Sequence, residues 1–260
     1  PEAQTATSPG TPPAESDTVE LSPFVVQSSR DTGYVAANTL SGSRLNTPLR
    51  DTPASISVMT SEFLSDIGAF ELNDAMKYAV NVEFFNDDDR TAINYNAVFQ
   101  EYQTYRVRGL PSSRSRNYFA WRSAIIPDET AFLDRIEDSR GPNSVLFGIG
   151  SPGGIINSST KQPRLDRSLR RTTATIGSHD SRRATFDYNQ PMLSGRLAMR
   201  LNLVYNHTNT FRHFEFSEHK RALLSALYKV NHRSRMRVEF ERGQLDNNTS
   251  LPITVANSYL

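Results

Sequence analysis

The sequence predicts an α+β domain followed by antiparallel strands of the kind that build a transmembrane β-barrel. Between residues 44 and 163, strand-like runs alternate with two amphipathic helical patterns. Beyond Arg170 the pattern changes, and apolar residues recur at every second position, as they do in strands. With 37% hydrophobic and 22% charged residues among 260, the chain has the composition of a folded protein.

Composition excludes several kinds of function. The 29 basic and 28 acidic residues leave a net charge of +1, so no overall field favours nucleic acid or a membrane surface as a partner. The absence of cysteine excludes a disulfide scaffold, thiolate zinc sites, iron–sulfur clusters and cysteine catalysis. No stretch approaches the roughly 18 consecutive apolar residues of a membrane-spanning helix, whereas alternating barrel strands remain possible.

The first 43 residues contain a leader and a short apolar segment. Residues 1–16 are mostly small residues and prolines, which predicts disorder. They include no basic and apolar signal regions, so a signal peptide is either absent or already removed, and in the second case the protein is exported. The segment Asp17–Val26 is β-prone and isolated by polar residues. It could pair with the sheet edge of another protein or form an ordinary edge strand of the next domain.

The α+β domain begins with a strand and two helices. Thr60 and Ser61 are expected to cap the first helix, and Gly68 to end it. Asp128 is expected to cap a third helix that runs through Phe132 and Leu133. The predicted elements are, in order, a strand at 55–59, helices at 61–67 and 72–80, a strand at 102–108 and a helix at 128–133.

About five antiparallel strands are predicted after Arg170. In residues 196–207 every odd position from Leu197 to Tyr205 is apolar, and the same alternation recurs in three further runs. Each run is near the 9 to 11 residues that a tilted strand needs to cross a bilayer. A soluble sandwich would alternate too, but charges on the polar face are typical of a wet barrel interior. These charged positions are Arg196, Arg200, Arg235, Arg237, Glu239 and Glu241.

The stretch from Arg140 to Pro163 contains a G-x-G-x-x-G spacing at residues 148–153. A dinucleotide-binding fingerprint opens a helix whose N-terminus holds pyrophosphate. Here Ile155, Ile156 and a polar run follow instead, and no acidic residue stands about 20 positions further on. The spacing therefore does not predict nucleotide binding.

The same stretch closely resembles the end of the plug domain of TonB-dependent outer-membrane receptors, especially the siderophore-receptor branch. Residues 51–82 resemble the plug's opening strand and two helices, and Arg106–Leu110 resembles the Arg-Gly end of a plug strand. The resemblance covers residues 44–163 and implies that residues 170–260 are the first strands of a barrel that is incomplete in this chain. The motif positions are Arg140, Gly141, Pro142, Ser144, Leu146, Gly148, Ser151, Pro152, Gly153, Gly154, Ile156, Asn157, Thr160, Lys161 and Pro163.

The resemblance also implies a site of energy coupling. A TonB box would lie in the region 17–43, within Asp17–Val26, and periplasmic TonB would bind it by strand addition and pull on the plug using the proton-motive force. In the same family a plug Arg and Glu pair with carboxylates of the barrel wall, and Arg140 and Glu137 would be that lock. The box residues would be Asp17, Thr18, Val19, Glu20 and Leu21.

The residues of the motif also have structural explanations. Pro142 suits the first turn of a short helix and Gly148 its left-handed cap. Gly153 and Gly154 would let the backbone turn tightly where a plug lies against a barrel wall. The motif would then hold the plug together without touching a ligand.

A basic and aromatic cluster follows the Arg-Gly strand end. By the resemblance, a plug loop at this level faces the external vestibule, where cations and rings can hold an anionic or catecholate iron chelate. A solvated loop is the alternative interpretation. The cluster consists of Arg114, Arg116, Tyr118, Trp121 and Arg122.

Other candidate sites are weaker. Asp87–Asp89 lack the spacing of a calcium-binding EF-hand loop, and the five histidines lack zinc-site spacing. No G-x-S-x-G nucleophile motif is present, and no residues form a catalytic constellation. The sequence therefore predicts no enzyme and no cofactor.

The resulting prediction is TonB-dependent transport of a ferric siderophore or a similarly bulky solute across the outer membrane. TonB, the chelate and outer-membrane lipid would be the partners, with the N-terminus in the periplasm and no nucleic acid bound. The alternatives are a receptor for cobalamin or an oligosaccharide, and a soluble periplasmic binding or signalling module. Because transporters of this kind close with about 22 strands, we expect these residues to be a fragment with an open sheet beside a compact plug.

Overall fold

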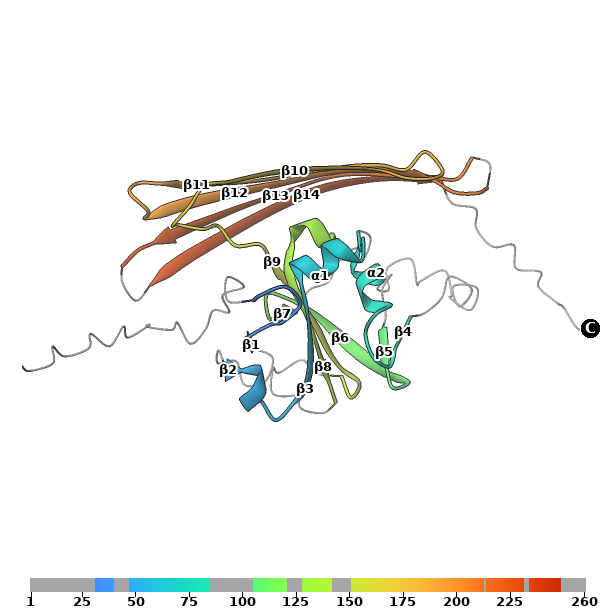
Figure 1. The fold of residues 1–260 in the computed structure, drawn as a ribbon, viewed down its shortest axis with the longest axis horizontal. Coiled ribbons are helices and arrows are strands. Elements are labelled where there is room, and N and C mark those ends of the chain that lie inside the picture. Colours follow the sequence, from blue (N-terminus) through green and yellow to red (C-terminus); the bar gives the residue numbers. More distant parts are fainter. Residues whose placement is uncertain are drawn as a thin grey trace, which may run out of the picture.

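The computed structural model describes residues 31–39, 47–84, 105–120, 128–141, 151–212, 214–231 and 234–248. It consists of an α+β domain and a long five-stranded sheet, here called the meander sheet, which spreads across one side of that domain (Figure 1). Several predictions lie outside the described residues: the leader, the box at Asp17, Thr18, Val19, Glu20 and Leu21, the Asp87–Asp89 run, Trp121, Arg122, Pro142, Gly148, His213 and His232.

The α+β domain is built on a mixed sheet of seven strands in the order β3-β8-β9-β6-β5-β4, with β7 paired to β6. Strands β6 and β9 run parallel, and the other neighbours are antiparallel. Its elements are β1 (Asn38–Thr39), β2 (Thr47–Pro48), a 3₁₀ turn (Leu49–Asp51), β3 (Ser55–Thr60), α1 (Ser61–Asp66), α2 (Leu72–Met76), β4 (Val82–Phe84), β5 (Tyr105–Val107), β6 (Leu110–Arg116), β7 (Phe119–Ala120), a second 3₁₀ turn (Thr130–Phe132), β8 (Leu133–Arg140) and β9 (Gly154–Thr160).

The start of the first helix agrees with its sequence signal. The Thr60 hydroxyl accepts a hydrogen bond from the backbone N–H of Phe63 at 3.2 Å, which satisfies one of the free donors of α1. Gly68 follows with a φ of +65°, a left-handed conformation that suits glycine and ends the helix. The second helix is shorter than predicted, because after Met76 the backbone continues as single turns.

The predicted helix at 128–133 is wrong. Glu129, and not Asp128, caps a single 3₁₀ turn by accepting a hydrogen bond from the N–H of Ala131 at 3.1 Å. Strand β8 then begins at Leu133 and lies between β3 and β9. The pairing available on both sides outweighs the local helical pattern.

The core of the α+β domain lies between its helices and one face of the sheet. It is apolar, and the side chains of α1 and α2 that point to the sheet are almost fully buried. Its members are Met59, Leu64, Ala69, Leu72, Ala75, Met76, Tyr105, Leu133, Ile136 and Ile156.

The two adjacent glycines of the motif are explained by packing within this domain. A Cβ atom on Gly153 would collide with the backbone carbonyl of Leu110, and one on Gly154 with that of Ser139. Gly154 also has a φ of +136°. The close approach is therefore to the backbones beside β6 and β8, and a position of these glycines against a barrel wall stays a prediction.

The meander sheet consists of β10 (Leu169–Ile176), β11 (Arg182–Met192), β12 (Leu197–Asn209), β13 (Phe216–Lys229) and β14 (Arg235–Asn248). Each strand pairs antiparallel with the next, which confirms the predicted run of about five strands. The helices in the described part of the chain are too short to span a membrane.

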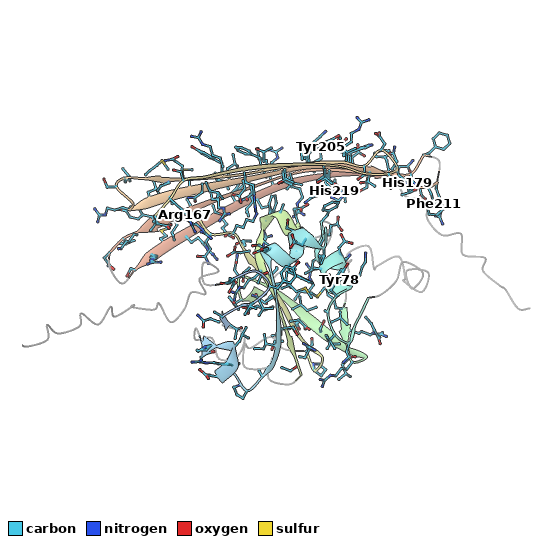
Figure 2. The ribbon with its side chains drawn as sticks, viewed as in Figure 1. Tyr78, Arg167, His179, Tyr205, Phe211 and His219 are labelled. Carbon is cyan, nitrogen blue, oxygen red and sulfur yellow. The ribbon has the colours of Figure 1, made fainter. Side chains whose placement is uncertain are left out.

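The two faces of the meander sheet differ in polarity. Along β12, Leu203 and Tyr205 are 39% and 37% exposed, whereas Arg200 and Asn202 are 5% and 1% exposed. Figure 2 shows Tyr205 on the outer side of the sheet and His219 on the side of the α+β domain. The apolar face therefore points outward, and the polar face is buried against the α+β domain.

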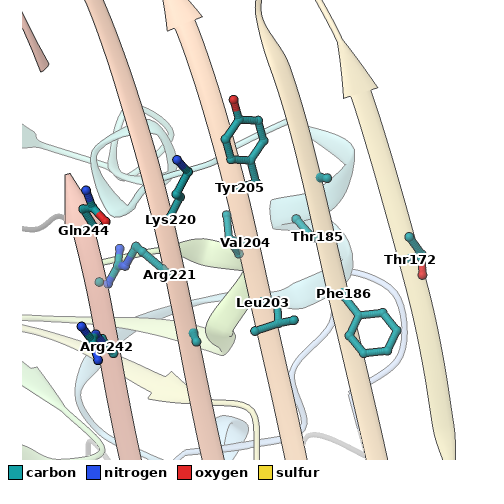
Figure 3. Close-up of a pocket in the computed structure, with 13 residues that line it drawn as sticks. Thr172, Thr185, Phe186, Leu203, Val204, Tyr205, Lys220, Arg221, Arg242 and Gln244 are labelled. Carbon is teal, nitrogen blue, oxygen red and sulfur yellow. The ribbon is translucent and has the colours of Figure 1, made fainter. Parts of the chain in front are cut away.

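A shallow depression lies on the outward face. It is lined by Phe186, Leu203 and Tyr205 together with Lys220 and Arg242 (Figure 3). These side chains come from neighbouring strands and stand on the apolar face, so the depression is separate from the contact with the α+β domain.

Candidate functional site

The contact between the α+β domain and the meander sheet is the best-formed polar site in the described residues. It is built from inward positions of β11 to β14 and from the end of the α+β domain where β6, β9 and the second 3₁₀ turn meet. Because side chains alternate along a strand, every second residue of these long strands is directed at the domain.

One group of contacts holds β14 to β6 and β9. Arg116 Nη1 donates to Glu241 Oε2 at 2.6 Å, and Arg221 also pairs with Glu241. Glu239 accepts hydrogen bonds from the Thr160 hydroxyl at 2.6 Å and from the Asn117 amide at 3.1 Å. The contacts of Arg116, Asn117 and Thr160 with β14 join residues that are 79 to 125 positions apart in the chain.

A second group surrounds Asp187 on β11. Arg200 binds its carboxylate through two nitrogens, at 2.8 and 2.7 Å, and Lys161 approaches to 3.2 Å. Arg200 also donates to the carbonyl of Gln162 at 2.8 Å. Burial lowers the pKa of Lys161, although the Asp187 carboxylate opposes that change. Lys161 is the lysine of the sequence motif, so this end of the motif is fixed to the sheet.

A third group lies next to α2. Arg183 pairs with both carboxylate oxygens of Glu129 and stacks over the ring of Phe70, 4.4 Å from its centroid. His219 Nδ1 lies 3.9 Å from Glu71 Oε1. Burial, together with the nearby Glu129 carboxylate, raises the pKa of Glu71 to about 7.

These groups make the contact polar rather than apolar. Buried ion pairs lose much of their attraction to desolvation, yet removing one partner leaves a costly unpaired charge. By contrast, water can replace each hydrogen bond if the surfaces separate. The arrangement can hold two bodies in one register and still release them when water enters.

The predicted lock residues, Glu137 and Arg140, are not brought together. They are three residues apart in β8, so their side chains leave opposite faces of the strand. Glu137 accepts hydrogen bonds from Arg135 at 3.2 Å, Thr39 at 3.1 Å and Tyr118 at 3.1 Å, all within the α+β domain. Arg140 contacts Ser57 and Asp138. Their pairing with wall carboxylates stays a prediction.

Arg140 has an unusual neighbour in Asp138. Burial raises the pKa of Asp138 to about 6, and Arg140 at 3.1 Å lowers it only in part. The side chain is 1% exposed. This buried acid belongs to the inside of the α+β domain and not to its contact with the meander sheet.

The location predicted for the basic and aromatic cluster is corrected. Arg114 and Arg116 lie in strand β6, and their side chains are buried. Asp128 binds the guanidinium group of Arg114 at 2.9 Å, and Glu241 binds that of Arg116 at 2.6 Å. Tyr118 lies in a two-residue turn with Asn117, both at positive φ, which joins β6 to β7. Its hydroxyl points to the buried Glu137. A role of these residues in ligand binding stays a prediction.

Sequence reasoning missed several residues of the contact. It identified Arg200, Glu239 and Glu241 as inward-facing charges, but not their partners Asp187, Thr160 and Arg116. The available signal was the alternation itself, since Asp187 stands between the outward positions of β11. Within the described residues, no group of three or more His, Asp or Glu side chains is placed to hold a metal ion.

Comparison with known proteins places this geometry in a family. A family model described as the TonB-dependent Receptor Plug Domain matches residues 48–155. The metal-pseudopaline receptor CntO of Pseudomonas aeruginosa is 30% identical over 194 residues, which are 74% of this chain and 26% of that protein. The catecholate siderophore receptor Fiu of Escherichia coli is 29% identical over 198 residues, 75% of this chain and 25% of that protein. This chain spans about a quarter of the length of these relatives.

Solved structures share the fold. The pyoverdine outer membrane receptor FpvA from Pseudomonas aeruginosa, bound to pyoverdine, has a TM-score of 0.72 at 20% identity over 84% of this chain and 31% of that chain. The closed form of Fiu from Escherichia coli has a TM-score of 0.71 at 24% identity, over 84% and 30% of the two chains. Because the meander sheet is more than 16% of the chain, a match over 84% of the chain must extend into that sheet. The chain therefore belongs to the TonB-dependent receptor family, with the α+β domain as its plug and the meander sheet as part of its barrel wall.

Proposed function

We propose that the protein imports a metal–siderophore chelate across the outer membrane in a TonB-dependent manner, with the α+β domain closing the lumen of the barrel. The proposal rests on the orientation of the meander sheet, whose apolar face is outward and whose polar face binds the plug. Outward side chains such as Val238 and Phe240 are 53% and 64% exposed and would face lipid. Inward side chains such as Asn202 are buried and polar.

The relatives support the class of ligand. CntO is named as a metal-pseudopaline receptor, Fiu as a catecholate siderophore receptor, and a Yersinia enterocolitica relative, 26% identical, as a ferrioxamine receptor. The chelates differ in chemistry, but all are bulky metal complexes. We therefore propose this class and no single member of it.

The polar contact between plug and wall suits the transport step. A plug that must move or loosen under load cannot be sealed by a large apolar interface, because exposing such a surface to water is costly. Here the carboxylates and guanidinium groups can be hydrated when the contact opens. TonB would supply the pull by adding a strand to the box at residues 17–21.

Deletion of residues 17–26 in the complete protein tests this function. Uptake of radiolabelled iron, presented with a panel of catecholate and hydroxamate chelators, should stop, whereas binding of the chelate at the cell surface should persist. Deletion of residues 1–10, which removes the same number of residues from the leader, is the matched control and should leave uptake intact.

Three results would contradict the proposal. Unchanged uptake after deletion of residues 17–26 would refute energy coupling through this segment. Uptake of cobalamin or an oligosaccharide, without uptake of any metal chelate, would refute the ligand class. Recovery of the protein in the periplasmic fraction, and not in the outer-membrane fraction, would indicate a soluble binding or signalling module.

A further inference from the structure

We propose that Arg135 is a positioning residue that fastens the segment of residues 31–39 to strand β8, so that tension on the upstream chain is delivered to the middle of the plug sheet. This inference rests on the proposed function, because it concerns the path of a pull that TonB would exert. The segment precedes the region matched by the family model and lies between it and the predicted box.

The fastening is a network centred on the Arg135 side chain. One terminal nitrogen, Nη2, pairs with the carboxylate of Asp31. The other, Nη1, donates to the backbone carbonyl of Asn38 at 2.6 Å and to Glu137 at 3.2 Å. Thr39 completes the network by donating its hydroxyl to Glu137 at 3.1 Å. A single guanidinium group therefore holds both ends of the segment.

Burial makes this network strong. The side chains of Arg135, Glu137 and Asp31 are 2%, 0% and 8% exposed, so water does not screen their charges. One cation lies between two carboxylates, and the Tyr118 hydroxyl donates to Glu137 from the other side. Removing Arg135 would leave two buried carboxylates without a cation, which strongly favours the closed network.

The middle of the segment has further contacts, but they are more exposed. The Thr60 hydroxyl donates to the carbonyl of Gly33 at 2.7 Å, and the Tyr34 hydroxyl donates to Asp66 at 2.8 Å. The ring of Tyr34 also packs edge-on against Phe63, although this tyrosine is 55% exposed. These contacts orient the segment over α1, whereas the buried ion pairs with β8 carry the load.

Strand β8 is well placed to pass the load to the barrel wall. It lies between β3 and β9 in the sheet, and the turn that precedes it carries Glu129, which pairs with Arg183 of the meander sheet. Its neighbour β9 ends at Thr160, which is bonded to Glu239. A displacement of β8 would therefore strain two of the three groups of contacts that hold the plug to the wall.

The test is the variant Asp31→Asn in the complete protein in outer membranes. It keeps the size of the side chain but removes the charge that faces Arg135. We expect hydrogen exchange of residues 31–39 to become about tenfold faster or more, because a charge-assisted bond is lost. Uptake of radiolabelled iron, presented with the catecholate or hydroxamate chelator that the wild-type protein imports, should fall at least about threefold, while binding of that chelate at the cell surface stays unchanged. Asp31→Glu, which restores a carboxylate, should recover part of the uptake.

Asp51→Asn is the matched control, since Asp51 is exposed and, among the described residues, forms an ion pair with Arg50 alone, at 3.6 Å. It should change neither exchange nor uptake. The proposal is overturned if Asp31→Asn leaves the exchange of residues 31–39 at the wild-type rate, or if it accelerates exchange but leaves uptake normal. Deletion of residues 17–26 separates the two ideas: if that deletion stops uptake and Asp31→Asn does not, the fastening is wrong and TonB-dependent transport stands. If the deletion itself leaves uptake intact, the transport proposal fails first.

Discussion

The core of the α+β domain and its contact with the meander sheet are two interiors built on opposite principles. The core joins ten buried apolar side chains from both helices and the sheet. The contact contains one small apolar cluster, Phe132, Val204 and Leu223, surrounded by ion pairs. The apolar core is difficult to open locally, whereas the polar contact can replace its hydrogen bonds with hydrogen bonds to water. This difference would let one chain keep a stable plug while its attachment to the barrel wall opens, as the proposed transport requires.

The largest expected effect comes from a cavity in the dry core. Leu72→Ala should lower the free energy of opening of the α+β domain by about 3 kcal/mol, because Leu72 is 1% exposed and the space cannot refill completely. Hydrogen exchange of α1 and α2 in the complete protein measures this change. Val80→Ala, at a site that is 56% exposed, is the control and should change exchange little. Equal effects of the two variants would mean that the core is not the stable unit.

A somewhat smaller effect is expected at the polar contact. Arg200→Met should weaken the attachment of the plug by about 2 kcal/mol, since Asp187 keeps Lys161 and gains water after losing its bidentate partner. These 260 residues contain no cysteine, so an Asn202→Cys reporter on the buried face is the one site within them that a maleimide can label. Labelling should accelerate in the Arg200→Met background.

The control for this measurement is Arg196→Met. Arg196 is exposed and directly precedes β12, which carries Arg200. It should leave the labelling of Asn202→Cys unchanged. If both substitutions accelerate labelling equally, general loosening of the sheet, and not loss of the Asp187 pair, would be the cause.

The pH dependence of the contact gives a third, moderate effect. The pKa of Glu71 is raised to about 7, above the ordinary value of 4.5, so the folded state favours the protonated acid. Stability from this group is therefore complete below about pH 4.5 and is lost as the pH rises through 7. Glu71→Gln should reduce the difference in Asn202→Cys labelling between pH 5 and pH 8. Glu83→Gln, at an exposed site on β4, should not. An undiminished pH difference in Glu71→Gln would assign the titration to another group.

The smallest effect is expected at the surface. Asp51→Asn removes an ion pair with Arg50 whose side chains are 59% and 86% exposed, and water screens such pairs. The free energy of unfolding should change by less than about 0.5 kcal/mol, measured by exchange of neighbouring amides. A larger loss would show that exposed charges contribute to stability as much as buried ones do.

The strands of the meander sheet were the most predictable part of the molecule. The alternation of apolar and polar residues is a reliable signal because each face of a strand lies in a single environment. The outward face could therefore be assigned correctly to Leu203 and the inward face to Arg200. The turn at Thr130–Phe132 was not predictable, because pairing of β8 with two distant strands decides its conformation. Local patterns carry no information on such neighbours.

For the candidate site, the sequence predicted which face of the sheet the charged side chains occupy, but not which residues they pair with. Arg116 and Glu241 are 125 positions apart, and Arg135 and Asp31 are 104 apart. Spacing in the sequence cannot reveal such pairs, because only the folded sheets bring them together. It was for this reason that Arg116 was interpreted as a solvent-facing loop residue, although it is a buried tie between plug and wall.

The adjacent glycines at the start of β9 have a consequence for how this protein can vary. Strand β9 runs beside β6 in a register that opposes Ser112 to Gly154 and Arg116 to Ser158. A single methyl group at Gly153 would push the two strands apart where they begin, and that shift would travel along β6 to the guanidinium of Arg116. The placement of a guanidinium group that binds the plug to the barrel wall thus depends on a glycine hydrogen atom beside the opposite end of its strand.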